Sequence, residues 1–179
     1  YEALKTMHFV LDLEHELAVL SKRFQTDNLS PSDVANAIRR AHEQLERLKT
    51  VDGVSLAGFM DEYDSATNTW KSISLEVQDG AEASCQETRR VLTTAVLEQS
   101  KANFDPLINS PIFTASMALE HRTWPISDGD ALRLHGNGEV AILIEQFSEL
   151  KLMEGFDKSE ALRQWELLKF ELPKHAFFK

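Results

Sequence analysis

The chain has 179 residues, of which 42% are hydrophobic and 27% are charged, with 7 glycines and 5 prolines. This length suits one domain, and the scarcity of glycine and proline favours long helices over a β-sandwich. The formal net charge of −10 argues against DNA binding by the whole surface, because neutralising phosphates requires lysine and arginine. The single cysteine, Cys85, excludes an intramolecular disulfide and a zinc site built on paired cysteines, and it fits a reducing compartment.

The sequence contains no apolar run long enough to span a bilayer and no signal-peptide pattern. The chain also begins inside an apparent helix, at Tyr1, without an initiator methionine. We therefore expect a fragment of a longer intracellular protein, folded as a single helical domain over residues 1–179. Two sub-lobes, 1–78 and 79–179, are a further subdivision that the pattern allows.

The first two predicted helices open the fold. Apolar residues recur at helical spacing over residues 2–24, which predicts a helix with one apolar stripe. The stripe consists of Leu4, Met7, Leu11, Leu13, Leu17, Leu20 and Phe24. Ser30 can cap a second helix that begins at Pro31, and Gly53 is expected to end that helix. Only a short link separates the two helices, so we predict an antiparallel hairpin.

Beyond the hairpin, the sequence predicts a mainly all-α, multi-helix array with one extended arm. The stretch 70–77 contains β-branched residues at a period of two, which is typical of a short strand or an extended arm. A long helix is predicted over about 81–104, where Asp105-Pro106 breaks it, and another over 140–150. Asp157 or Ser159 is expected to begin the last clear helix.

Candidate catalytic and metal-binding groups are few. His8, Asp12 and His15 share one face of the first predicted helix and can in principle hold a metal ion, but we favour a solvated polar face. Carboxylates cluster at 61–64 and at 128–130 without the spacing of a calcium loop. No nucleophile elbow, Walker loop or dinucleotide-binding turn occurs. The sequence therefore predicts no catalytic set, no metal site and no cofactor, and we expect that the fragment is not an enzyme.

Two sets of side chains are candidates for contact with nucleic acid or a protein partner. The basic set consists of Arg39, Arg40, Arg47 and Lys49. These side chains can touch phosphates or an acidic partner, or they can form the outer face of a helix paired with Glu43 and Glu46, which we favour. Arg122 and Trp124, in a predicted loop, form the second set, although core packing is the default expectation for Trp124.

The order of the features suggests a family. A hairpin link at 27–33 is followed by the arm at 70–75, by a long helix that runs into Phe104, and by the segment Leu119–Pro125. This order resembles the helical insertion domain of hAT-superfamily transposases, as retained in domesticated zinc-finger proteins of transposon origin. The resemblance covers most of the chain.

The last of these segments shows both the match and the departures. In the family this motif often reads Leu-Asp-Pro-Arg followed by an aromatic residue; here Arg122 and Trp124 match, whereas Glu120-His121 replaces Asp-Pro. The family's insertion interrupts a ribonuclease-H-like core, with two catalytic aspartates before it and one glutamate after it. No segment here matches the surroundings of any of the three, and Cys85 lacks the nearby histidine of the family's Cys/His motif. No catalytic role is carried over.

The resemblance implies a non-catalytic helical scaffold of a transposase-derived nuclear protein, which serves oligomerisation or protein partner binding and supports a DNA complex. The expected partner is therefore protein, either a second copy or another chain, with DNA reached through the parent protein. We expect no membrane association, and no small-molecule substrate is identified. Two alternatives stay open: a nucleic-acid-binding module that uses the local basic patch, and a small metal-dependent hydrolase built on the acidic and His8 clusters.

Overall fold

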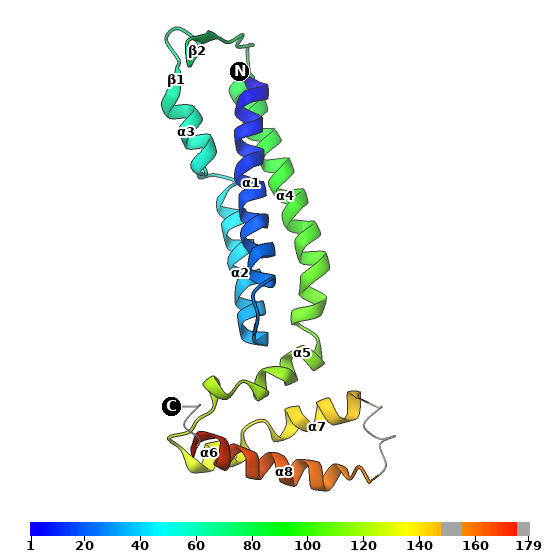
Figure 1. The fold of residues 1–179 in the computed structure, drawn as a ribbon. Helices are drawn as coiled ribbons and strands as arrows, with labels where there is room; N and C mark the ends of the chain where they lie inside the picture. The colour runs from blue at the N-terminus through cyan, green and yellow to red at the C-terminus, as the bar shows by residue number, and fades with distance from the viewer. Residues whose placement is uncertain (148–154, 175–179) are drawn as a thin grey trace. The chain divides into compact units, whose positions relative to one another are not determined.

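The computed structural model describes residues 1–147 and 155–174 and is built mainly of helices (Figure 1). The chain divides into two compact units, one formed by Tyr1–Leu29 with Val34–Phe104, and the other by Ser30–Asp33 with the described residues from Asp105 onwards. The mainly all-α class predicted from the sequence is confirmed. The boundary between the units falls at Asp105 rather than between residues 78 and 79.

The elements follow one another in a simple order along the chain. The longer helices are α1 (Glu2–Phe24), α2 (Pro31–Arg47), α3 (Val54–Glu62), α4 (Ala81–Ile108), α7 (Asn137–Gln146) and α8 (Lys158–Glu171). The shorter helical elements are α5 (Pro111–Ser116), η1 (Met117–Leu119), η2 (His121–Thr123), α6 (Gly129–Leu134) and η4 (Leu172–Lys174). No helix in the described part of the chain is both long and apolar enough to cross a membrane.

The predicted helical hairpin is present in the first unit. The bounds of α1 match the prediction, and the link to α2 is capped reciprocally. The Asp33 main-chain N–H donates to Ser30 Oγ at 3.1 Å, while the Ser30 hydroxyl and N–H donate to Asp33 Oδ2. These bonds satisfy donors that the first turn of α2 leaves without partners, which fixes where the second helix begins. Figure 1 shows α1 and α2 antiparallel, with α4 alongside.

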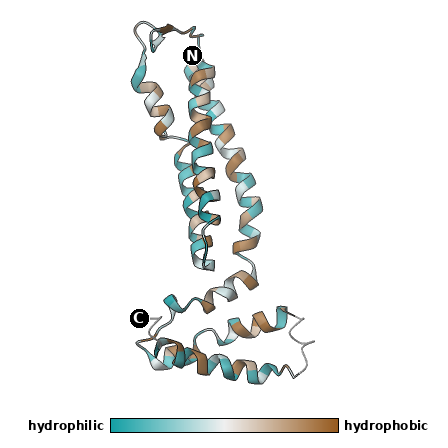
Figure 2. Ribbon diagram, viewed as in Figure 1, coloured by the Kyte–Doolittle hydropathy of each residue, from teal (hydrophilic) through white to brown (hydrophobic). Residues whose placement is uncertain are grey.

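The core of the first unit corrects the predicted stripe on α1. Its buried members come from four helices and from the turn that follows α2, and they comprise Phe9, Leu13, Leu45, Leu48, Leu56, Phe59 and Leu97. Phe9 and Leu13 therefore face inward, whereas Met7 and Leu11 are 61% and 50% exposed. The reason is that α3 packs on α1 and that Leu97 of α4 joins the same core cluster, so the inward face centres on Phe9 and Leu13 rather than on Met7 and Leu11. Figure 2 shows hydrophobic and hydrophilic residues interspersed along α1 and α4.

The predicted extended arm is part of a small antiparallel sheet. Strands β1 (Tyr63–Asp64), β2 (Thr69–Trp70) and β3 (Ile73–Ser74) lie in that order, with Trp70 paired to both Tyr63 and Ile73. Lys71 and Ser72, which connect β2 to β3, both have positive φ angles, 48° and 66°. Two positive φ angles at the centre of a two-residue turn match the twist of the flanking strands.

Pro106 lies inside α4, although the sequence predicted that the helix would end at Asp105-Pro106. A proline lacks one main-chain donor and disturbs the preceding turn, so it is tolerated best near a helix end. Here α4 continues only two residues past Pro106, and the boundary between the two units falls just before Asp105. The proline therefore marks the change of unit rather than the end of the helix.

The second unit has its own core, in which Trp124, Leu132 and Trp165 are buried together. Gly136, with φ of 71°, precedes α7, and a Cβ there would lie 2.8 Å from Cζ2 of Trp165. Helix α7 begins at Asn137, three residues before the predicted start, and residues 148–150 of that prediction lie outside the described residues. Asp157 caps α8 and accepts from the Ser159 N–H at 2.7 Å, the first of the two predicted options.

Candidate partner-binding surface

Four exposed apolar side chains that are not part of the core lie in or next to one groove of the first unit. Leu11, Val51 and Val54 line a groove of about 460 Å³ between α1 and the link from α2 to α3. Met7 lies one helical turn before Leu11 on α1. The exposed fractions are 61% for Met7, 50% for Leu11, 41% for Val51 and 90% for Val54. We call these four residues the apolar surface.

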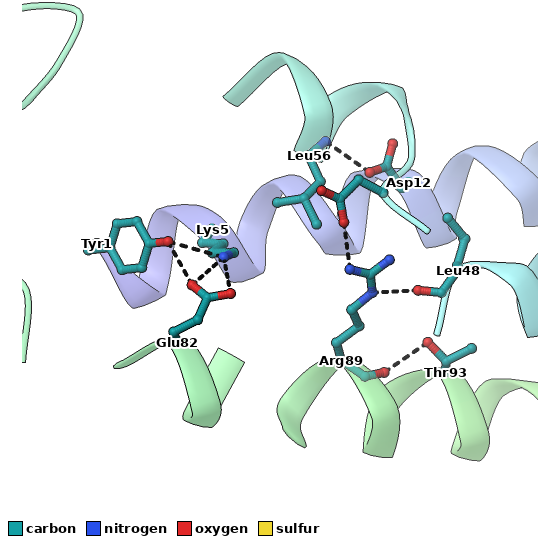
Figure 3. Close-up of polar contacts among 9 residues, drawn as sticks. Tyr1, Lys5, Asp12, Leu48, Leu56, Glu82, Arg89 and Thr93 are labelled. Atoms are coloured by element: carbon teal, nitrogen blue, oxygen red, sulfur yellow. Dashed lines mark hydrogen bonds and ion pairs between the residues drawn. The ribbon is translucent and has the colours of Figure 1, made fainter. Parts of the chain in front are cut away.

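Asp12 sets the position of α3 and therefore one wall of the groove. Its side chain is only 6% exposed, and one of its oxygens accepts from the Ser55 N–H at 2.7 Å. The other accepts from the Leu56 N–H at 2.9 Å (Figure 3). A carboxylate at this end of a helix satisfies free donors and favours the positive end of the dipole. Gly53, predicted to end α2, is instead the N-cap residue of α3, because α2 ends at Arg47.

The charged residues along the groove are mostly acidic, and two of them are used within the fold. Asp12 is used as the cap of α3, and Asp52 forms an ion pair of 2.6 Å with Arg89, whose side chain is 12% exposed. Arg89 also donates through Nε to the main-chain carbonyl of Leu48 (Figure 3). The other two charged residues that line the groove are Glu16, which is acidic, and Arg47, which is basic. The carboxylates of Asp12, Glu16 and Asp52 outnumber the cations Arg47 and Arg89, so the groove carries a net negative charge, as the whole chain does.

The predicted basic set is only partly available for phosphate contact. Lys49 forms an ion pair with Glu46 at 2.8 Å, which fits the prediction that these cations form the outer face of a helix. Arg39 donates to Asn36 Oδ1 at 2.7 Å. Arg40 and Arg47 are exposed on α2, and Arg47 lines the groove. Of the basic set, Arg47 is the residue that the structure places beside the apolar surface.

Trp124 and Arg122, the other predicted contact residues, have different environments in the second unit. The indole of Trp124 is 6% exposed, donates through Nε1 to the Ala118 carbonyl at 2.9 Å, and packs edge-on against Trp165. Trp124 is therefore a core residue, and its buried side chain is not available to contact a partner in the folded protein. Arg122 lies in η2 with a side chain that is 68% exposed.

A histidine and a serine lie within hydrogen-bond distance of each other beside the cap of α3. His8 Nδ1 lies 2.8 Å from Ser55 Oγ, and the His8 ring stacks on Phe59. A serine nucleophile needs free donors to stabilise the oxyanion that forms after its attack. The neighbouring main-chain donors of α3, at Ser55 and Leu56, are already bonded to Asp12. The arrangement is explained by packing.

The proposed metal-binding face on α1 is not assembled. Asp12 is buried as a cap and His8 bonds to Ser55, so the first two members are used elsewhere. In residues 1–147 and 155–174, no group of three histidines, cysteines or carboxylates is placed to share an ion. The acidic cluster at 128–130 has a structural use, because Asp128 caps α6. The Asp64 carboxylate likewise bonds within its own turn, to the Ala66 N–H.

A polar cluster joins the start of α1 to α4. The Lys5 ammonium lies 2.6 Å from Glu82 Oε2, and the Tyr1 hydroxyl donates to the same oxygen at 3.0 Å (Figure 3). The hydrogen bond from Lys5 lowers the pKa of Glu82, whereas burial raises the pKa of Tyr1. Burial also raises the pKa of the nearby Cys85 thiol, which keeps it protonated and unreactive.

Sequence reasoning missed Val51 and Val54 as surface residues. The signal was available, because two valines flank the polar turn Asp52-Gly53, where a solvated link normally carries polar side chains. Because Gly53 was predicted to end α2, Val54 was not recognised as the first residue of α3.

No known protein family, curated protein or solved structure is significantly similar to this chain.

Proposed function

We propose that this chain is a non-catalytic helical scaffold that binds protein through the apolar surface, with a second copy of itself as the first partner. The observation that carries the proposal is the exposure of Leu11, Val51 and Val54 in one groove, with exposed Met7 one helical turn before Leu11. Apolar patches of this kind on soluble proteins commonly mark sites of protein interaction. Val54, at 90% exposure, gains most from being covered.

The shape of the apolar surface supports self-association. A two-fold dimer uses the same patch on both copies, so the patch must carry both a projection and a recess. Val54 and Met7 are the most exposed of the four, at 90% and 61%, whereas Leu11 and Val51 are 50% and 41% exposed and line the groove together with Val54.

The two alternative functions have less support. A nucleic-acid module needs several unpaired cations together, but Lys49 is paired with Glu46 and the whole chain carries −10. A hydrolase built on the His8 cluster needs Asp12 as a ligand or base, but both oxygens of Asp12 cap α3. A mobility-shift titration at low salt and metal analysis of the purified protein test these alternatives directly.

We further propose that the parent protein is derived from an hAT-like transposase and works in the nucleus. The support is the order of the hairpin, the arm and the Leu119–Pro125 segment in the sequence. The test is the sequence that flanks this segment in the full gene product. A zinc finger upstream and an acidic triad divided around this segment are expected. Flanks with neither feature would contradict this origin, while leaving the scaffold proposal intact.

The scaffold proposal is tested by light scattering coupled to size-exclusion chromatography. The expected result is a mass that rises from monomer toward dimer as the loaded concentration increases. A strict monomer over the whole concentration range contradicts self-association. In that case, variants of Val54 would have to show that a different protein binds through the same surface.

A further inference from the structure

Lys169 is a fully buried cation in the second unit whose hydrogen bonds all go to neutral groups. Its side chain is 0% exposed, and Nζ donates to the carbonyls of Arg133 at 2.7 Å and His135 at 2.8 Å, and to Asn137 Oδ1 at 2.7 Å. These three acceptors use all three protons of the ammonium. Burial lowers the pKa of Lys169, and the charge of Glu166 offsets this in part. A buried ammonium without a bonded carboxylate is costly.

The one side-chain acceptor on Lys169 belongs to a chemically labile dipeptide. Asn137 is followed by Gly138, and a glycine offers the least steric obstruction to attack of its main-chain nitrogen on the preceding side-chain amide. Helix α7 begins at Asn137, so the Gly138 N–H is among the first donors, which have no acceptor within the helix. Gly138 is exposed, and an added Cβ would meet nothing within 4 Å. No neighbouring atom therefore stands over Gly138 on the side where a Cβ would lie.

We propose that Asn137 is a site of spontaneous deamidation, in which Lys169 polarises the side-chain carbonyl and then retains the product aspartate as its counter-ion. The Gly138 nitrogen gives its proton to solvent and bonds to Asn137 Cγ, and the Cγ–Nδ2 bond breaks with release of ammonia. Water then opens the cyclic imide. Attack at Cγ restores the normal peptide and leaves a side-chain carboxylate, whereas attack at the main-chain carbonyl carbon leaves an isoaspartyl link.

Lys169 favours the attack at Cγ in both steps. Its ammonium bonds to Oδ1, which is the oxygen that gathers negative charge when a nucleophile adds to Cγ. A positioned cation at such an oxygen lowers the barrier to addition. The native protein should therefore form a larger share of normal aspartate than an unfolded chain, in which no ammonium is held at this oxygen.

The product exchanges one hydrogen bond for a charged one, and its second carboxylate oxygen takes the place of Nδ2 beside the Arg133 carbonyl. Asn137 Nδ2 donates to the Arg133 carbonyl at 3.1 Å, and this bond is lost with the ammonia. The same carbonyl keeps the bond from Lys169 at 2.7 Å. Replacing the amide oxygen with a carboxylate oxygen converts the third bond of Lys169 into a charge-assisted one, which is shorter and stronger.

The experiment incubates the full 179-residue chain at physiological temperature and mildly alkaline pH, both folded and in urea. Peptide mapping by mass spectrometry follows conversion at Asn137 and, as an internal reference, at exposed Asn109, which precedes Ser110. We expect position 137 of the folded chain to convert at least about tenfold faster than position 109. We also expect a higher share of normal aspartate in the folded chain than in urea.

Two variants complete the test. Gly138→Ala keeps Asn137 and Lys169, has space for its Cβ, and should slow conversion at position 137 severalfold. Asn137→Asp should raise the thermal midpoint above that of the wild type, whereas the control Asn109→Asp should not. The proposal is overturned if position 137 converts no faster than position 109. It is also overturned if the aspartate share is equal in the folded chain and in urea, or if Asn137→Asp lowers the midpoint.

Discussion

Gly53 lies so close to Asp12 that a Cβ added at the glycine would stand 2.3 Å from Asp12 Cγ. The N-cap position of α3 therefore carries no side chain, because a carboxylate from α1 does the capping in its place. This relationship fixes where α3 starts relative to α1. It also fixes the direction in which Val54, the first residue of α3, projects from the groove.

Replacement of Gly53 by alanine should destabilise the first unit by about 1–3 kcal/mol, as overpacked substitutions do. The new methyl group must displace Asp12 and thereby weaken its bonds to the α3 main chain. The measurement is the free energy of unfolding in urea. Gly58→Ala is the matched control, since a Cβ there meets nothing within 4 Å and alanine favours a helix. Equal effects of the two substitutions would contradict the capping role.

Replacement of Asp12 by alanine should cost about 1–2 kcal/mol, since the cap is lost and buried donors are left unpaired. The loss should be local. Hydrogen exchange is therefore expected to accelerate most at the amides of Ser55 and Leu56. Asp12→Asn should have a smaller effect, because its amide oxygen can still accept one of the two bonds. Uniform acceleration of hydrogen exchange over all helices would argue against a local capping role of Asp12.

Replacement of Lys169 by methionine should destabilise the second unit by about 2 kcal/mol, because the ammonium joins α8 to the turn before α7 through three hydrogen bonds. Arg163→Met on the same helix is the control, since its side chain is 57% exposed and pairs with Glu160 one turn away. Thermal unfolding followed by tryptophan fluorescence is suitable, because Trp165 lies beside Lys169. A Lys169 variant as stable as the Arg163 variant would contradict this role.

The pair Lys5–Glu82 should give the first unit a defined dependence on pH. The hydrogen bond from Lys5 lowers the pKa of Glu82 below its ordinary 4.5, so its stabilisation is present above pH 4.5 and is lost as pH falls through the lowered pKa. Burial tends to lower the pKa of Lys5, but hydrogen bonds to Glu82 and Tyr1 raise it overall from 10.5. Its contribution is present below pH 10.5 and is lost as pH rises through the raised pKa.

The size of this effect is modest, because the Glu82 side chain is 58% exposed and solvent screens the pair. About 0.5–1 kcal/mol is expected at neutral pH. The measurement compares the urea midpoints of wild type and Glu82→Gln across this pH range. Their difference should be largest near neutrality and should shrink at both ends. A difference that does not vary with pH would show that the pair contributes no charge-dependent stability.

The sequence predicted the elements whose signals are local. The bounds of α1, the Ser30 cap of α2 and the Asp157 cap of α8 each follow from residues within a few positions of the helix end. The short strands near Trp70 were also visible in the period-two pattern. These features depend on main-chain hydrogen bonds that neighbouring residues satisfy.

The failures involve partners distant in the sequence. Gly53 was assigned to α2 because its true capping partner, Asp12, comes from another helix. Met7 and Leu11 were placed in the core because helical periodicity shows an apolar face but not which part of it α3 and α4 cover. Trp124, by contrast, was expected by default to pack in the core, and its burial against Trp165 confirms this. The apolar surface emerges only after these long-range contacts are known.

Sedimentation equilibrium of the wild type and two matched variants tests the central claim most directly. Val54→Asp places a charge on the apolar surface at a side chain that is 90% exposed, and Val91→Asp places one on α4 at a side chain that is 49% exposed. We predict that the wild type and Val91→Asp form dimers with the same dissociation constant, whereas Val54→Asp stays monomeric with an unchanged helical content. A wild type that remains monomeric, or a dimer that tolerates the charge at Val54, would contradict the account.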